Sequence, residues 1–158
     1  MFEGEVVSIH IAEAEGEDVF EVSEVRAVPG KGLEGDRYFH RAGSFSRKEA
    51  PAREVTLVES EAVEALARDY GIELEPGATR RNIATRGVPL NHLVGRRFRV
   101  GETVLRGERL CDPCSLLESM TKPGLRKGLA HRGGLNAAIV SGGVIRKGDR
   151  ICSEDGGP

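Results

Sequence analysis

Leu93-Val-Gly-Arg-Arg-Phe-Arg-Val-Gly-Glu-Thr-Val-Leu-Arg-Gly-Glu-Arg-Leu110 is the stretch that decides the fold of this chain. Its apolar residues come singly or in pairs, and the glycines Gly95, Gly101 and Gly107 interrupt them every six residues. Runs that turn this often favour short antiparallel strands over a parallel, doubly wound sheet. We therefore expect a mainly β fold of the α+β class, in which short strands form an antiparallel β-barrel with a few peripheral helices.

The predicted strand leads into Cys111-Asp-Pro-Cys114-Ser-Leu-Leu117, where we expect the chemistry of the chain to lie. Asp112 precedes a proline and is therefore biased away from helical geometry, which keeps the segment between the two cysteines turn-like. Helix formers follow Cys114, and a thiol at the start of a helix is shifted toward thiolate, the form that attacks or binds a metal. The alternative is that both cysteines are small, buried core residues.

Length and composition limit the classes of protein to be considered. The 158 residues are enough for one domain with a real core, which we place at 1–158 with a flexible tail from about 153 to 158. No run approaches the roughly 18 apolar residues of a membrane span, and the N-terminus lacks a signal pattern. Three clustered cysteines do not make a secreted disulfide framework. We expect a cytoplasmic protein.

Charge is unevenly distributed, although the net charge is only −2. Residues 1–28 hold eight acidic residues and one arginine, whereas residues 78–109 hold eight arginines and two glutamates. A block of arginine without lysine favours planar, bidentate recognition of an anion such as phosphate, although several of these arginines are expected to coat exposed strands. Nucleic acid is not an expected partner, because a chain with no tryptophan and two tyrosines offers few stacking platforms.

Periodicity predicts the remaining elements of secondary structure. The expected strands are 6–11, 20–27, 54–58, 137–140 and 144–152, and the expected helices are 60–70, 114–120 and 123–130. Gly71 should end the helix at 60–70 in the usual C-terminal manner. The polar segment 41–53 is read as a plain loop, with a substrate lid as the alternative.

Four polar clusters stand out: Gly35-Asp-Arg37, Arg80-Arg-Asn82, Cys111-x-x-Cys114 and His131-Arg-Gly-Gly134. Their sequence and order resemble the MOSC domain, the C-terminal module of molybdenum cofactor sulfurases, from about Glu5 to Arg150. The most specific matching segments are Gly32-Leu-Glu-Gly-Asp-Arg37, Arg81-Asn-Ile-Ala-Thr-Arg-Gly87, Leu90-Asn91, Leu93-Val-Gly95, Arg132-Gly-Gly134, Gly142-Gly143 and Gly148-Asp149.

The resemblance implies a MOSC or pyruvate-kinase-barrel-like fold that binds the molybdenum cofactor, a pterin dithiolene that holds the metal and ends in a phosphate. Cys114 matches the family cysteine that supplies a soft thiolate to molybdenum, so it is the expected metal ligand and catalytic residue. The expected cofactor-binding residues are Asp36, Arg37, Arg80, Arg81, Asn82 and Arg132. Pyridoxal phosphate binding is a further term attached to the family as a whole. Cys111, Cys152 and His131 are given no role.

Two functions follow from the resemblance. In the first, the protein is a molybdenum-dependent oxidoreductase that reduces N-hydroxylated compounds of the hydroxylaminopurine or amidoxime type and takes electrons from a separate donor protein. In the second, it is a carrier that delivers the cofactor, or a persulfide on Cys114, to a partner protein without turnover. The first is favoured because the cysteine lies among anion-binding groups.

Two other readings of the cysteines are weighed against these. A zinc site from Cys111, Cys114, Cys152 and a histidine rests on one CxxC without a second matching pair, which is a weak signal. A thioredoxin-like dithiol lacks the βαβ pattern around its CxxC. Neither nucleic acid nor a membrane is expected as a partner.

Overall fold

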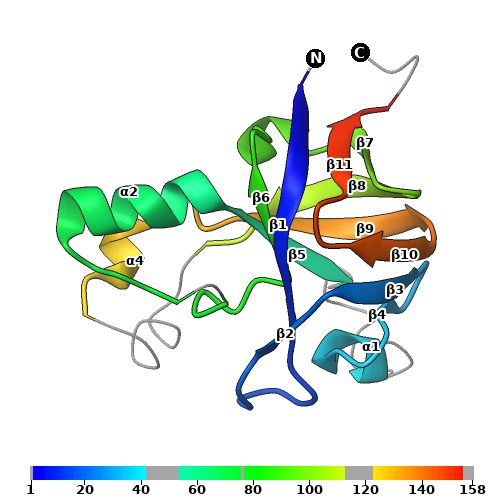
Figure 1. Ribbon diagram of the computed structural model, residues 1–158, viewed down its shortest axis with the longest axis horizontal. Coiled ribbons are helices and arrows are strands. Elements are labelled where there is room, and N and C mark those ends of the chain that lie inside the picture. Colours follow the sequence, from blue (N-terminus) through cyan, green and yellow to red (C-terminus); the bar gives the residue numbers. More distant parts are fainter. Residues whose placement is uncertain (1, 42–53, 76, 113–122, 155–158) are drawn as a thin grey trace.

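A computed structural model describes residues 2–41, 54–75, 77–112 and 123–154 (Figure 1). The strands are β1 (Glu3–Ile11), β2 (Phe20–Val22), β3 (Glu24–Val28), β4 (Gly32–Leu33), β5 (Val55–Glu59), β6 (Ile83–Arg86), β7 (Arg97–Val100), β8 (Thr103–Leu110), β9 (Leu135–Ser141), β10 (Gly143–Arg146) and β11 (Arg150–Ser153). The helical segments are α1 (Arg37–Arg41), α2 (Ser60–Tyr70), the 3-10 turn η2 (Leu90–Leu93) and α4 (Leu125–Gly128).

The described strands close into a barrel in the order β11-β7-β8-β9-β5-β6-β1, and β1 completes it by pairing with β11. All of these pairings are antiparallel except that of β5 with β6, where Leu57 lies opposite Ile83. The antiparallel barrel expected from the sequence is therefore confirmed. A smaller sheet of β10, β3 and β4 lies beside the barrel. The short strand β2 pairs with the end of β1, from Ile9 to Ile11.

The glycine-spaced stretch forms the β7–β8 hairpin, in which Val100 pairs with Thr103. Gly101 makes the turn with a φ of 58°, a conformation that favours glycine. Gly107 has a different role, because a Cβ there would lie 2.1 Å from the carbonyl oxygen of Leu93. The even spacing thus marks turns and one close approach of two backbones, and β8 is longer than the sequence predicts.

Helix α2 spans the predicted residues, and Gly71 ends it in the left-handed conformation at a φ of 69°. Its apolar face packs on α4 through a small cluster that includes Leu66, Leu125 and Leu129, apart from the main core. None of the helices in the described part of the chain is long and apolar enough to cross a membrane.

Two predicted strands are each divided in the structure. Residues 20–27 form β2 and β3, which belong to different sheets, and residues 144–152 form β10 and β11 on either side of a turn at Gly148. The predicted helix at 123–130 is reduced to α4. The predicted helix at 114–120 and most of the polar segment 41–53 lie outside the described residues.

The barrel interior holds the main core, in which Val55, Leu57, Ile83 and Leu135 are fully buried. Side chains alternate between the two faces of a strand, so the neighbours of these residues project from the outer wall. Several of those neighbours are polar and yet buried, including Thr56, Asn82 and Asn136. A buried polar layer therefore lies on the outside of the barrel wall.

Candidate functional site

The described residues of the four polar clusters meet at one end of the barrel, where β1 and β8 end and β6 and β9 begin. Hydrogen bonds between the clusters join them. Arg37 donates to the carbonyl of Arg80 at 2.9 Å, and the Cys111 N–H donates to the carbonyl of Gly134 at 2.8 Å. Arg81 donates to the carbonyls of Gly133 and Asp112 at 2.8 and 3.4 Å. Motifs that are about a hundred residues apart in the chain thus form one site.

Asp36 and Arg37 form a buried ion pair at the start of α1, with a distance of 3.2 Å between Oδ1 and Nη1. Asp36 also accepts the backbone N–H groups of Ala12 and Tyr38, so its carboxylate is fixed by β1 as well as by α1. The Arg37 guanidinium lies 4.5 Å from the centre of the Tyr38 ring, within the range of a cation–π contact. Arg37 is therefore held in place before any ligand arrives.

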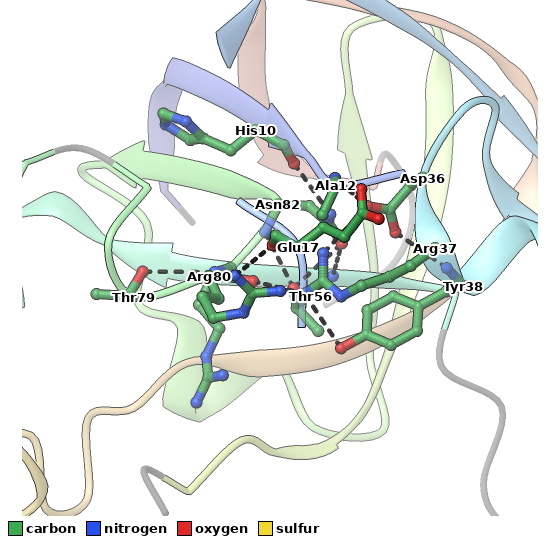
Figure 2. A network of polar contacts seen from close by, with 11 residues as sticks. His10, Ala12, Glu17, Asp36, Arg37, Tyr38, Thr56, Thr79, Arg80 and Asn82 are labelled. Atoms are coloured by element: carbon green, nitrogen blue, oxygen red, sulfur yellow. Dashed lines mark hydrogen bonds and ion pairs between the residues drawn. The ribbon is translucent and has the colours of Figure 1, made fainter. Parts of the chain in front are cut away.

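Arg80 is in the left-handed conformation, with a φ of 64°, which is uncommon for a residue other than glycine. Its guanidinium donates to the backbone carbonyl of Glu17 at 2.7 Å, and Figure 2 shows it next to Arg37. Burial and the charge of Arg37 both lower the pKa of Arg80, in that order. A bound anion would therefore stabilise the charged form of Arg80, which its burial and the neighbouring charge of Arg37 disfavour.

Arg81 connects the cysteine segment to the turn at 131–134. Its Nε donates to the Gly133 carbonyl and one terminal nitrogen reaches the Asp112 carbonyl. Within the described residues no carboxylate pairs with Arg81 or Arg80, and both side chains bond only to backbone oxygens. Two adjacent arginines whose hydrogen bonds to the described residues all go to backbone oxygens are a suitable site for an anion.

Asn82 is fully buried, and its side chain is used within the fold. Its Nδ2 donates to the carbonyl of His10 at 3.0 Å, and its Oδ1 accepts both the N–H and the hydroxyl of Thr56, at 3.0 and 3.1 Å. These bonds tie β1, β5 and the residue before β6 together beneath the arginines (Figure 2). Asn82 thus supports the site from below, and its contact with a cofactor stays a prediction.

The sequence pattern of the MOSC domain matches residues 44–152, more than half of the chain. The chain belongs to the MOSC domain family. This family is associated with proteins of the molybdenum cofactor. No curated protein sequence matches the chain.

Solved structures of other MOSC proteins share the fold. The YuaD protein from Bacillus subtilis is 20% identical with a TM-score of 0.78, over 96% of this chain and 97% of that one. YiiM from Geobacillus stearothermophilus is 17% identical with a TM-score of 0.73, over 96% and 75% of the two chains. YiiM from Escherichia coli is 18% identical with a TM-score of 0.66, over 98% and 70%. Such identities establish the fold alone.

The expected molybdenum ligand of this MOSC domain, Cys114, lies outside the described residues. Cys111 is half-buried at the end of β8, whereas Cys152 lies on β11 opposite Arg99 of β7. Arg99 pairs with Val104, which is seven residues before Cys111, so the backbones of the two cysteines are separated by about 20 Å along the strand direction at the usual rise of a strand. Cys111 and Cys152 therefore do not share a zinc ion, and no cluster of three potential metal ligands occurs among the described residues.

Arg132 and His131 lie in the turn that bonds to Arg81. The carbonyl of His131, which has a φ of 65°, accepts the Asn91 side chain at 2.7 Å. Arg132 donates to the carbonyl of Gly128 at 3.4 Å. Burial raises the pKa of Glu59, and the charge of Arg132 is one of the smaller effects that oppose this rise. Arg132 therefore acts on the α2–α4 side of the site, while Arg37, Arg80 and Arg81 form the main cluster.

Several groups that position the arginines cannot be identified from the sequence. The carbonyls of Glu17, Gly133 and Asp112 hold the arginines, and no side chain marks such a role. Tyr38 was missed as well, although its position directly after Arg37 is a signal that an arginine could stack on its ring.

Proposed function

We propose that this MOSC domain binds the molybdenum cofactor at the Arg37–Arg80–Arg81 cluster and reduces N-hydroxylated compounds, with Cys114 as the thiolate ligand of molybdenum. The observation that supports it most is the pair Arg80 and Arg81, whose guanidinium groups bond only to backbone carbonyls among the described residues. The cofactor ends in a phosphate, and arginine forks are well matched to phosphate oxygens.

The residues present fit that cofactor in charge and in layout. Among the described residues, Asp36 is the one carboxylate that forms an ion pair with any of the three guanidinium groups, which leaves positive charge for a phosphate to neutralise. The Cys111 N–H is bound to Gly134, so the segment that leads to Cys114 starts at a fixed point beside Arg81. A thiolate is a ligand suited to molybdenum, and it can complete a shell begun by a dithiolene.

Each residue of the cluster has a distinct task in this proposal. Arg80 and Arg81 bind and orient the phosphate, and Arg37 holds the Arg80 backbone through its carbonyl. The bound cofactor supplies two-electron chemistry, in which two electrons and two protons convert an N–OH group into N–H and water. In this proposal the electrons come from a separate donor protein.

Metal content tests the proposal directly. We expect about one molybdenum per chain in protein made in cells that synthesise the cofactor, and loss of that metal together with N-hydroxylamine reduction in Cys114→Ser. Cys111→Ser is the matched control, because it removes a thiol from the same segment and keeps the backbone bond from Cys111 to Gly134. Elemental analysis for molybdenum and zinc provides the measurement.

Three other outcomes have distinct meanings. Molybdenum that is bound by Cys114 without any turnover, even with a chemical reductant, would favour the carrier function. Equal loss from both cysteine variants would indicate a dithiol site. Zinc in place of molybdenum, or neither metal after the cofactor is added, would contradict cofactor binding.

A further inference from the structure

A cavity of about 220 Å³, here called the Ser8 cavity, lies on the outer wall of the barrel, and none of the three clustered arginines lines it. Its floor is a row of paired residues on three neighbouring strands, Ser8 of β1, Ala84 of β6 and Val58 of β5. The row faces outward, because the chain neighbours Ile83 and Leu57 belong to the core. The central residue of the row is an alanine, whose short side chain leaves space above the sheet.

Two segments cover this floor. Helix α2 lies over one side with Val63, and the chain that runs back from α2 toward β6 lies over the other with Leu74 and Gly77 (Figure 1). The walls are therefore largely apolar. A cavity of about 150 Å³ lined by apolar side chains accommodates benzene, so the Ser8 cavity has room for a six-membered ring with a small substituent.

Ser8 is the polar group at the floor of the cavity, and its partner is His10. The Ser8 Oγ lies 2.8 Å from His10 Nε2, and the imidazole packs against Gly77, where a Cβ would lie 2.6 Å from Nδ1. Burial lowers the pKa of His10, so at neutral pH the ring is uncharged and has one N–H donor and one acceptor nitrogen.

The neutral imidazole leaves Ser8 able to bind a ligand in either tautomer. When Nε2 accepts the Ser8 proton, the Ser8 oxygen keeps lone pairs for a ligand donor. When Nε2 carries the proton and donates it to Ser8, the Ser8 hydroxyl proton is available to a ligand acceptor. A ligand hydroxyl, which both donates and accepts, matches this group in both cases.

The charged residues of the cavity favour a neutral ligand. Arg86 is the one cation among the described residues that line it, and Arg86 is ion-paired with Glu64. Both side chains are exposed, which places them at the opening to solvent, together with the carboxylate of Glu75. A ligand carboxylate would therefore meet two like charges and a cation that is already paired.

We propose that the Ser8 cavity binds a small, neutral, monocyclic phenol. The ring packs among Val58, Val63 and Leu74, and the phenol hydroxyl forms a hydrogen bond with Ser8. This site is separate from the arginine cluster, and the inference does not depend on the proposed function.

An occupant of the cavity contacts the segment that leads into the arginine cluster. The Gly77 carbonyl accepts the Arg80 N–H at 2.8 Å, and the Thr79 hydroxyl accepts the Arg81 N–H at 3.4 Å. Gly77 and Thr79 both line the cavity. A bound phenol thus lies against the residues whose backbone and side chain hold the two arginines.

Titration of the full chain with matched small molecules tests the proposal. Phenol and toluene have nearly the same shape and differ in the hydroxyl group, and benzoate adds a charge. We expect saturable binding of phenol at about millimolar concentration, and binding of toluene weaker by about fivefold to tenfold, the equivalent of one hydrogen bond. Benzoate should bind more weakly than either. Amide chemical shifts in NMR spectra report the affinity and show whether Leu74, Gly77 and Ala84 respond.

Two variants locate the ligand. Ser8→Ala should remove the preference for phenol and leave the affinity for toluene unchanged, a change in ratio that a merely structural role of Ser8 would not produce. Ala84→Leu extends a side chain into the cavity, so it should abolish binding of both compounds while the thermal midpoint stays equal to that of the wild type or rises. Ala130→Leu is the matched control, because it makes the same change at an exposed alanine that does not line the cavity.

The opposite results would overturn the proposal. These are an absence of saturable phenol binding, equal affinity of the wild type for phenol and toluene, or shift changes centred away from Leu74, Gly77 and Ala84. Phenol binding by a folded Ala84→Leu variant as tight as that of the wild type would also overturn it. If Ala84→Leu does not fold, the phenol-to-toluene ratio in Ser8→Ala and the location of the shift changes decide the question.

Discussion

Arg80 combines a strained backbone with a charge that its surroundings disfavour, and both point to a binding role. Its φ of 64° costs about 1 kcal/mol or more in a residue other than glycine, and burial beside Arg37 lowers its pKa. A side chain kept under such conditions contributes more to binding than to stability.

Arg80→Ala should therefore reduce molybdenum retention by about tenfold or more, because a charge-assisted contact to phosphate is lost. Its thermal midpoint should stay within about 3 °C of the wild type, since among the described residues the side chain has one hydrogen bond, to the Glu17 carbonyl. Arg150→Ala is the control, an exposed arginine paired with Glu3 near the far end of β1. A large decrease in midpoint for Arg80→Ala would make Arg80 structural, and the phosphate assignment would fail.

At this scale the sequence indicated which residues lie together better than it indicated what each side chain contacts. Arg37, Arg80 and Arg81 were predicted to share a site, and the structure joins them. Asn82 was grouped with them, but its amide is bonded to His10 and Thr56 within the fold. A buried scaffold amide and a ligand-binding amide look alike in a sequence, because only the tertiary neighbours decide where the two hydrogen-bonding groups point.

Among the elements, the turn at residues 131–134 holds the site together. Two of its carbonyls accept Arg81 and Cys111, and Asn91 anchors its first residue. Gly134 has a φ of 120°, and a Cβ there would lie 2.2 Å from the carbonyl oxygen of Leu57. The turn can approach β5 only because this residue is glycine.

Gly134→Ala should lower the free energy of unfolding by about 3 kcal/mol or more, since the added methyl group displaces the turn from β5. Gly30→Ala is the matched control, because Gly30 also has a positive φ but no atom lies within 4 Å of its added Cβ. That control should cost about 1 kcal/mol for the backbone conformation alone. Urea unfolding measures both, and equal losses would show that the approach of the turn to β5 is not needed.

The elements differ in how well their sequence predicts them. Helix α2 has an apolar stripe and a terminal glycine, both local signals, and its bounds were predicted correctly. The division of 20–27 into β2 and β3 depends on which sheet each half joins, which is a tertiary property. Gly107 was read as a turn because a sequence does not show that the Leu93 backbone passes beside it.

For the molecule as a whole, His10 makes stability depend on pH. Its ring is 4% exposed, is bonded to Ser8 at 2.8 Å and lies against Gly77. Burial lowers its pKa from 6.5, while the charge of Glu21 on β2 acts in the opposite sense. The unfolded chain therefore binds a proton at a higher pH than the folded chain, so stability decreases as pH falls below about 6.5 and stops decreasing below the folded pKa.

His10→Gln should reduce that dependence, so the difference in unfolding free energy between wild type and variant should shrink between about pH 7 and pH 5. Glu59 contributes a pH dependence of the opposite sign. Burial raises its pKa, so its contribution to stability is lost as the pH rises through the pH range in which Glu59 titrates. Taking the difference between the two proteins removes the Glu59 contribution. His131→Gln, which changes an exposed histidine, is the control. A difference that stays constant with pH would contradict a buried, neutral His10.

The sequence predicted that the strands form a barrel, but it did not predict which two strands pair to close it. Frequent turns and short apolar runs indicate curled antiparallel strands, and this is what the structure shows. The pairing of Glu3 with Cys152 joins strands at opposite ends of the chain, and no local pattern encodes a partner so distant in sequence. The parallel β5–β6 pair was missed for the same reason.

That closure has a practical consequence for handling the protein. β1 and β11 leave the barrel at the same rim (Figure 1), while the arginine cluster lies beyond the other end of β1, nine residues or about 30 Å away. A tag, a fluorophore or a link to an electrode placed before Glu3 or after Glu154 therefore holds the molecule by its far side. The end of the barrel that carries the arginine cluster then points away from the attachment point, toward soluble ligands and a docking protein.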